Sequence, residues 1–220
     1  MKREIMITLD GSTTIHLPDW DEQYHSKNGA IQEAYHVFIK AGFEQFPQEN
    51  ISILEIGFGT GLNSFITFLE AEKANKTIDY VGVEAYPVED GEIEKLNYIS
   101  ELKAENNQEI FTKMHVVSWD EKQAVSNDFS ITKRKQFFHE IEDVNQFDLI
   151  YFDAFGAKNQ PELWTEEIFS KMFTAIKQNG ILVTYSAKGS VRRAMQAVGF
   201  IVERLPGPPG KREMLRATKN

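Results

Sequence analysis

The residues most able to do chemistry in this sequence surround a glycine-rich turn. Glu55 precedes three glycines in five residues, Gly57, Gly59 and Gly61. Glycines let the backbone turn tightly and approach a ligand closely. The spacing G-x-G-x-G matches neither the dinucleotide fingerprint nor the phosphate-binding P-loop. An acid before the first glycine disfavours a pyrophosphate and suits a ligand that carries an ammonium group.

Glu84 is the second candidate, because it ends the next apolar segment, 23 residues after Gly61. A carboxylate accepts hydrogen bonds without donating, so Glu84 could accept both hydroxyls of a ribose. The alternative is a tight turn with no ligand. Such a turn needs one glycine at most, and further glycines cost stability. The turn and Glu84 together therefore predict a site for a ribose-bearing ligand.

Asp153 is the third candidate, at the end of the apolar segment 147–153. Acids are depleted in strands. A carboxylate beside a cationic ligand could stabilise that cation, orient an attacking amine or take its proton. A plain turn or helix-capping role is the alternative.

Apolar periodicity predicts the elements that must position these residues. Alternating runs around Asp10-Gly11 predict a hairpin over 4–17, and an amphipathic helix is expected over 31–46. The remaining strands are expected at 51–56, 80–84, 115–117, 147–153 and 180–185, with two more around the loop 206–210. The remaining helices are expected at 62–74, 88–104, 162–178 and 189–198, the third capped by Asn179-Gly180.

Strands that alternate with helices predict an α/β fold with a mostly parallel, doubly wound sheet. The last two strands predict an antiparallel hairpin at one edge. We expect an N-terminal extension, 1–46, packed on a core domain, 47–220, in a single globular unit. In such a sheet the glycine turn, Glu84 and Asp153 meet at the crevice beyond the carboxyl ends of the strands.

Composition excludes several functional classes. The 220 residues contain no cysteine, which rules out a disulfide scaffold, a thiolate nucleophile and a Cys-ligated metal. No apolar run is long enough to span a membrane, and no export signal is visible, so we expect a cytoplasmic protein. The five histidines show no metal-ligand spacing, so no metal is expected.

Charge is unevenly spread along the chain. The net charge is −9, which argues against coating of nucleic acid by bulk charge. From Val191 onward the segment carries +5, and residues 1–190 carry −14. This basic segment is either a face for a polyanion or an ordinary solvated surface.

Four blocks carry a resemblance to a known family: LEIGFGTGLN, FDLIYFDAFGAKNQPELWTEEIF, GSVRRAMQAVGF and PGPPGKREML. Together they resemble the tRNA 5-methylaminomethyl-2-thiouridine methyltransferases, over roughly residues 20–217. The resemblance implies a Rossmann-like class I fold that uses S-adenosyl-L-methionine. In many bacteria this activity is the N-terminal half of a bifunctional enzyme whose second half is a flavin-dependent oxidase. The chain stops at Asn220, so it resembles a stand-alone form, with a separate oxidase in the same pathway.

The resemblance also implies site residues for the cofactor. The leader YHSKNGAIQEAYHVFIKAG, before the glycine turn, fits the family as well. The cofactor-binding candidates are Tyr24, Asn28, Glu55, Gly57, Gly59, Gly61, Asn63 and Glu84. Family members carry an acid near the adenine of the cofactor. In the corresponding segment, 129–143, no acid can be assigned to this role, because Glu140, Glu142 and Asp143 are expected on a helix.

The activity implied is transfer of a methyl group to the primary amine of an aminomethyl wobble uridine, with Asp153 as the catalytic residue. The partner implied is the tRNA anticodon arm. The substrate-binding candidates are Phe155, Trp164, Tyr185, Arg192, Arg193, Lys211 and Arg212. Trp164 fits a pocket wall or the core equally well. N-methylation of a small molecule or protein, and a non-catalytic cofactor- or RNA-binding module, remain as alternatives.

Overall fold

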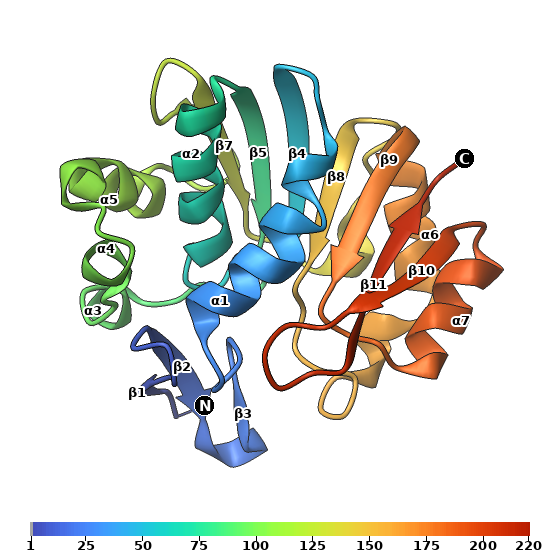
Figure 1. The fold of residues 1–220 in the computed structure, drawn as a ribbon, viewed down its shortest axis with the longest axis horizontal. Helices are drawn as coiled ribbons and strands as arrows, with labels where there is room; N and C mark the ends of the chain where they lie inside the picture. Colours follow the sequence, from blue (N-terminus) through green and yellow to red (C-terminus); the bar gives the residue numbers. More distant parts are fainter. Residues whose placement is uncertain (1) are drawn as a thin grey trace.

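The computed structural model describes residues 2–220, and its centre is one large mixed sheet (Figure 1). Its eight strands lie in the order β10-β11-β9-β8-β4-β5-β7-β6. Their bounds are β4 Asn50–Ile56, β5 Thr77–Val83, β6 Lys122–Ala124, β7 Phe129–Arg134, β8 Phe147–Phe152, β9 Ile176–Thr184, β10 Ile201–Pro206 and β11 Glu213–Thr218. The five strands from β9 to β7 run parallel, and β6, β11 and β10 are antiparallel additions at the two edges. The mostly parallel sheet with a C-terminal hairpin is confirmed.

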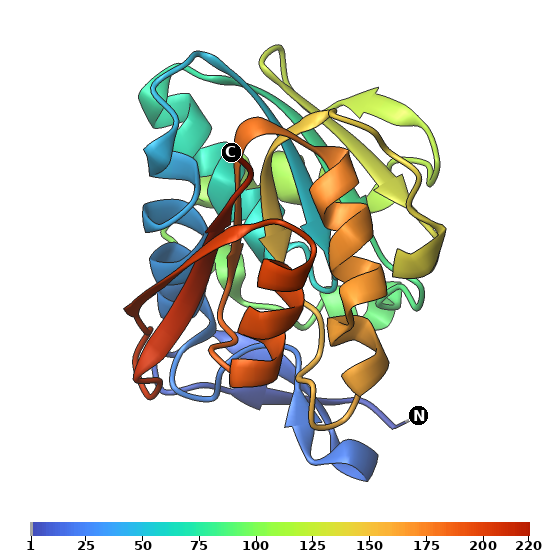
Figure 2. The same ribbon diagram turned by 90° about the vertical axis from the view of Figure 1, so that its right-hand side faces the viewer.

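Helices cover both faces of this sheet (Figures 1 and 2). Their bounds are α1 Ala30–Ala34, α2 Leu62–Ala74, α3 Asp90–Ile93, α4 Tyr98–Glu101, α5 Gln108–Val116, α6 Glu166–Ala175 and α7 Gly189–Ala197. One core layer joins α2, α5 and the π-helical turn after α1 to the sheet through buried Phe65, Phe111 and Phe38, respectively. The other joins α6 and α7 to the opposite face through Phe169 and Met195. The central strands β4, β5 and β8 each end in four consecutive buried residues, so both of their sides are covered there, as is typical of a buried parallel sheet.

A small three-stranded sheet lies beyond the carboxyl ends of the parallel strands (Figure 1). It consists of β1 Glu4–Ile7, β2 Thr13–Leu17 and β3 Glu22–Gln23, so the hairpin expected over 4–17 is present. Asn97 attaches it to the domain, because its side chain accepts from Thr13 N at 2.7 Å and donates to Gly11 O at 2.9 Å. This small sheet therefore covers the end of the domain where ligands of α/β sheets bind.

Two expected elements, the strand over 115–117 and the helix over 88–104, differ from the structure. Residues 115–117 do not form a strand, because His115 and Val116 end α5, whose Phe111 and Met114 are buried one turn apart. The third parallel strand is β7 instead. The helix expected over 88–104 is divided into α3 and α4 around Asn97, whose side chain is used to hold the small sheet.

The glycine cap expected at 179–180 is also wrong. Helix α6 ends at Ala175, and Asn179 and Gly180 lie inside β9, where Asn179 has a φ of 63° and the pairing with β8 shifts register. The Lys219 side chain donates to Phe173 O at 2.7 Å and to Ile176 O at 2.9 Å, which caps the helix end instead. The helix expected over 31–46 is α1 followed by a π-helical turn, Tyr35–Lys40, and a short 3₁₀ turn, Phe43–Gln45.

Candidate active site

The glycine turn follows β4 and is enclosed on two sides. Gly57 has a φ of 90°, and a Cβ added there would lie 2.7 Å from the carbonyl oxygen of Asp153. A Cβ on Gly59, at a φ of 50°, would lie 3.1 Å from the ring of Tyr24. Only glycine combines this conformation with this close approach. The turn therefore brings the tip of β4 against the tip of β8 and against the N-terminal leader.

Asn63 joins two carboxylates at the start of α2. Its Nδ2 donates to Glu55 Oε1 and to Asp153 Oδ2, each at 2.9 Å. Tyr80 donates to the other oxygen of Glu55 at 2.9 Å. Glu55 is 1% exposed, and burial raises the pKa of its carboxyl, with Asp153 and Glu84 adding to the rise. The sequence-predicted residues Glu55, Asn63 and Asp153 thus form one hydrogen-bonded group.

Asp153 has a carboxyl that is easily protonated. Burial raises its pKa to about 7, and the nearby Glu33 carboxylate adds to the rise. The hydrogen bond from Asn63 and the Lys211 ammonium act in the opposite direction. A carboxyl whose pKa lies near neutrality is well matched to accept and release a proton.

Glu84 lies just beyond β5 and is fixed by backbone N–H groups. Gly59 N donates to its Oε2 at 3.1 Å, and Tyr86 N donates to its Oε1 at 2.9 Å. Burial raises the pKa of this carboxyl, and the two N–H groups reduce that rise. Each oxygen keeps a free lone pair, so Glu84 can still accept from two ligand hydroxyls.

Aromatic side chains line the approach to the turn. Phe155, just after β8, meets the ring of Tyr24 edge-to-face at 4.9 Å and that of Trp20 at 5.9 Å. Tyr185, just after β9, donates to Ala154 O at 2.7 Å. These contacts bring the predicted residues Tyr24, Phe155 and Tyr185 to the same end of the sheet.

Trp164 does not lie at a pocket mouth. Its side chain is 5% exposed and packs against Phe152 and Phe169 in the core layer beneath α6. Its Nε1 donates to Phe155 O at 2.8 Å. Because its faces are covered by protein, the base-stacking role is wrong and the core alternative is correct.

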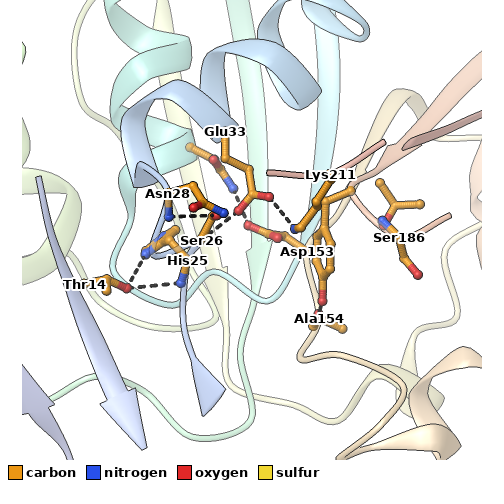
Figure 3. A network of polar contacts seen from close by, with 12 residues as sticks. Thr14, His25, Ser26, Asn28, Glu33, Asp153, Ala154, Ser186 and Lys211 are labelled. Carbon is orange, nitrogen blue, oxygen red and sulfur yellow. Dashed lines mark hydrogen bonds and ion pairs between the residues drawn. The ribbon is translucent and has the colours of Figure 1, made fainter. Parts of the chain in front are cut away.

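The four predicted basic residues do not share one environment. Arg193 and Arg212 are exposed, and Arg192 is partly exposed, with its Nε buried and without a partner among residues 2–220. Lys211 instead turns inward and forms an ion pair with Glu33. Figure 3 shows Glu33, Asp153 and Lys211 facing one another, with Asn28 and His25 nearby.

The sequence predictions missed Glu33 and His25. Glu33 is 7% exposed, and its carboxylate also accepts from Ser26 N at 3.0 Å. The signal was present, since Glu33 shares the helical spacing of the apolar positions Ala30, Ala34 and Val37. His25 approaches Thr14 Oγ1 at 3.0 Å through Nδ1, and burial lowers its pKa to about 4. His25 is therefore a neutral structural contact of the leader.

The acids of 137–143 do not form the expected helix. The only regular element there among the described residues is a 3₁₀ turn, Phe138–Glu140. Asp143 forms a bidentate pair with Arg134 at 2.6 and 3.1 Å, and Glu140 accepts from Phe137 N at 2.7 Å. Asp143 and Glu140 are therefore already engaged within the protein.

Residues 94–220 match the model of a family described as S-adenosyl-L-methionine-dependent methyltransferase. The chain belongs to this family. The curated relatives of this methyltransferase include the "tRNA 5-methylaminomethyl-2-thiouridine biosynthesis bifunctional protein MnmC" of Hydrogenovibrio crunogenus and of Nitrosospira multiformis. The first is 28% identical over 89% of this chain, and the second is 29% identical over 88%. The matched regions are only 31% and 33% of those relatives, so the methyltransferase spans about a third of their length.

Solved structures share the fold of the methyltransferase. MNMC2 from Aquifex aeolicus aligns with a TM-score of 0.80 at 24% identity, covering 100% of this chain and 70% of that one. Spermidine synthase from Thermotoga maritima aligns with a TM-score of 0.56 at 15% identity, covering 100% and 72%. The Rossmann-like methyltransferase fold implied by the sequence blocks is confirmed.

The residues of the site fit the cofactor of this family. Asn63 Oδ1 is buried without a partner among residues 2–220, so an acceptor for a ligand N–H remains in the middle of the site. The carboxylates of Glu55 and Asp153 suit an ammonium group, and the free lone pairs of Glu84 suit ribose hydroxyls. Within residues 2–220, no cluster of three or more acids and histidines could hold a metal ion. In the same part of the chain, no helix has the length and apolar character needed to cross a membrane.

Proposed function

We propose that the chain methylates the primary amine of 5-aminomethyl-2-thiouridine at the tRNA wobble position, giving 5-methylaminomethyl-2-thiouridine. The observation that carries this proposal is the Asp153 carboxyl, held by Asn63 at the tip of β8 with a pKa of about 7. The name of the curated relatives, which concerns this tRNA modification, supports the same assignment.

We assign cofactor binding to the residues around the glycine turn. Bound S-adenosyl-L-methionine supplies an electrophilic methyl group on a sulfonium. Glu55, Asn63 and the turn would hold its amino-acid part, and Glu84 its ribose. Tyr24 and Asn28 of the leader would close over the turn from the other side, since Tyr24 already contacts Gly59.

Asp153 has the role of orienting the amine and receiving its proton. Only a neutral amine has the lone pair needed for attack. Its two N–H bonds can donate to the ionised Asp153, which would orient that lone pair toward the methyl group. The new nitrogen–carbon bond would form as the bond between the methyl group and the sulfonium sulfur breaks, which leaves a neutral thioether. The nitrogen would then lose one proton, which the Asp153 carboxylate would take up and pass to solvent. Holding the amine in line is a larger contribution than chemical activation of it.

The nucleic acid is expected to approach from the basic C-terminal region. The wobble base lies in a single-stranded loop and can be turned out into the site, where Phe155 and Tyr185 would contact it. Arg192, Arg193 and Arg212 supply cations for phosphates of the anticodon arm. We place the protein where its tRNA substrate is, in the cytoplasm, and we propose that a flavin-dependent oxidase acts in the same pathway.

A transfer experiment tests this function directly. Purified protein is incubated with methyl-labelled S-adenosyl-L-methionine and tRNA that carries the aminomethyl group, and the wobble nucleoside is isolated. Label in that nucleoside is the expected result. Robust transfer to a small amine or a protein, with none to wobble uridine, would support the alternative N-methyltransferase. Cofactor binding without transfer to any of these would support a non-catalytic module.

A further inference from the structure

The loop between β10 and β11 reaches across to the N-terminal leader. Pro206 O lies 2.8 Å from His36 Nε2. Gly210 is so close to Asn28 that an added Cβ would lie 2.0 Å from the Asn28 amide nitrogen. Lys211 continues inward from this loop and ends against Glu33 on α1. The loop and the leader thus close the site from opposite ends of the sequence.

The Lys211 ammonium has two partners at this position. It forms an ion pair with Glu33 and lies 3.9 Å from the centre of the Tyr185 ring. That ring is fixed in turn, because its hydroxyl donates to the carbonyl of Ala154, next to Asp153. A cation held between a carboxylate and an aromatic face is less available to bind a phosphate at the surface.

Asp153 is surrounded by charged and titratable groups from several elements. They are Glu33 on α1, Lys211 on the β10–β11 loop, Glu55 on β4, Tyr80 on β5 and Tyr185 after β9. Asn63 on α2 adds a neutral donor. Lys211 is the cation of this group, and Glu33 is the acid nearest to it (Figure 3).

We propose that Glu33 and Lys211 are positioning residues for the methyl transfer: their ion pair sets the charge around Asp153, and Lys211 acts there rather than on a tRNA phosphate. The two side chains have opposite effects. Glu33 favours the protonated Asp153, and Lys211 favours the ionised form that can receive a proton. This inference rests on the proposed function in one point, that Asp153 orients the substrate amine and receives its proton.

The decisive measurement is the titration of Asp153 itself in the whole protein. Carboxyl-¹³C aspartate is incorporated, and the Asp153 resonance is assigned by its loss in D153N. In K211M the remaining Glu33 charge should move the titration upward by about one pH unit or more. In E33Q the remaining Lys211 charge should move it downward by a similar amount. The double variant E33Q/K211M should titrate between the two.

Controls separate this effect from general damage. R204M removes another cation of the same hairpin, one that lies 3.5 Å from Glu213 at the surface, and should leave the Asp153 titration unchanged. K211R keeps the charge and should restore the wild-type titration. Should K211M fail to fold, judged by circular dichroism and melting, K211Q replaces it. Shifts in the same direction for E33Q and K211M, or no shift in either, would overturn the proposal.

Kinetics give a second, separable readout. The acid limb of kcat/KM for tRNA should move as the carboxyl titration does, up in K211M and down in E33Q. The salt dependence of KM for tRNA should not change in K211M, whereas loss of a phosphate contact would reduce its slope. A reduced slope would overturn the assignment of Lys211. If wild-type protein methylates no tRNA, the carboxyl titration still decides the ion pair, so the two failures are distinct.

Discussion

The amide of Asn63 donates a 2.9 Å hydrogen bond to the carboxylate of Asp153, and it does so from the first turn of the helix that follows the glycine turn. This contact links the proposed cofactor-binding segment to the proposed catalytic carboxyl. Any substitution of Asn63 should therefore change turnover as well as the affinity for the cofactor.

Asn63→Asp should raise the pKa of Asp153 further, because a donor that lowers it is replaced by an acid. Turnover near pH 7 should fall by about tenfold or more, and part of it should return at higher pH. The measurement is kcat across pH. Asn75→Asp, at the exposed end of α2, makes the same chemical change away from the site and should leave the profile unaltered.

Asp153→Ala should reduce turnover by about 10²–10⁴-fold, the usual contribution of a group that orients and deprotonates a nucleophile. The affinity for S-adenosyl-L-methionine should change far less, since Glu55, Glu84 and the glycine turn remain. Calorimetric titration with the cofactor and single-turnover assays give the two quantities. Equal loss in both would contradict the role assigned to Asp153.

The activity of the wild-type protein should depend on pH through the same carboxyl. Burial raises the pKa of Asp153 to about 7, so kcat/KM should rise between about pH 6 and 8 as this group ionises. An ordinary aspartate would place that limb near pH 4. A profile that is flat above about pH 5 would exclude Asp153 as the proton acceptor.

The stability of the folded protein should fall as pH rises, whereas kcat/KM should increase. A carboxyl with a raised pKa binds its proton more tightly in the folded chain than in the unfolded one. Its contribution to stability is therefore lost as pH rises from about 4 to about 7. Asp153→Asn should raise the melting temperature at pH 8 and change it little at pH 4. An identical difference at both pH values would show that the gain has another cause.

Gly57→Ala should destabilise the fold by about 1–3 kcal/mol and weaken cofactor binding. Its φ of 90° disfavours a side chain, and an added Cβ would lie only 2.7 Å from the Asp153 carbonyl oxygen. Gly91→Ala, in α3, has no atom within 4 Å of the added Cβ and serves as the control. Denaturant unfolding and cofactor titration of both variants check this. Equal stability of the two would contradict the close packing of the turn.

Local pattern was enough to predict the central part of the fold. Strands β4, β5 and β8 are mostly apolar, and the residues that end them could be placed at one crevice by topology alone. The errors arose where tertiary contacts override local preference. Asn97 interrupts a helix because its side chain holds the small sheet, and Asn179 is drawn into β9 by pairing with Lys219.

The ion pair at the site could not be predicted in the same way. Glu33 and Lys211 are 178 residues apart, and no periodicity relates them. Lys211 belongs to a run of basic residues, so its charge alone suggested a surface role. Trp164 shows the same limit, since an aromatic after a strand tip fits a pocket wall and a core position equally well until the fold places it.

The contacts between the leader and the β10–β11 loop have a consequence for the order in which the protein acquires its site. During synthesis the glycine turn, Glu84 and Asp153 emerge well before Lys211. Asn28 and Glu33 therefore meet their partners only after the β10–β11 loop has emerged. Such distant contacts are slow to close. A nascent chain that stops short of this loop should hold its sheet but retain an open site. Tight cofactor binding would therefore show that the β10–β11 loop has been synthesised and has reached the leader.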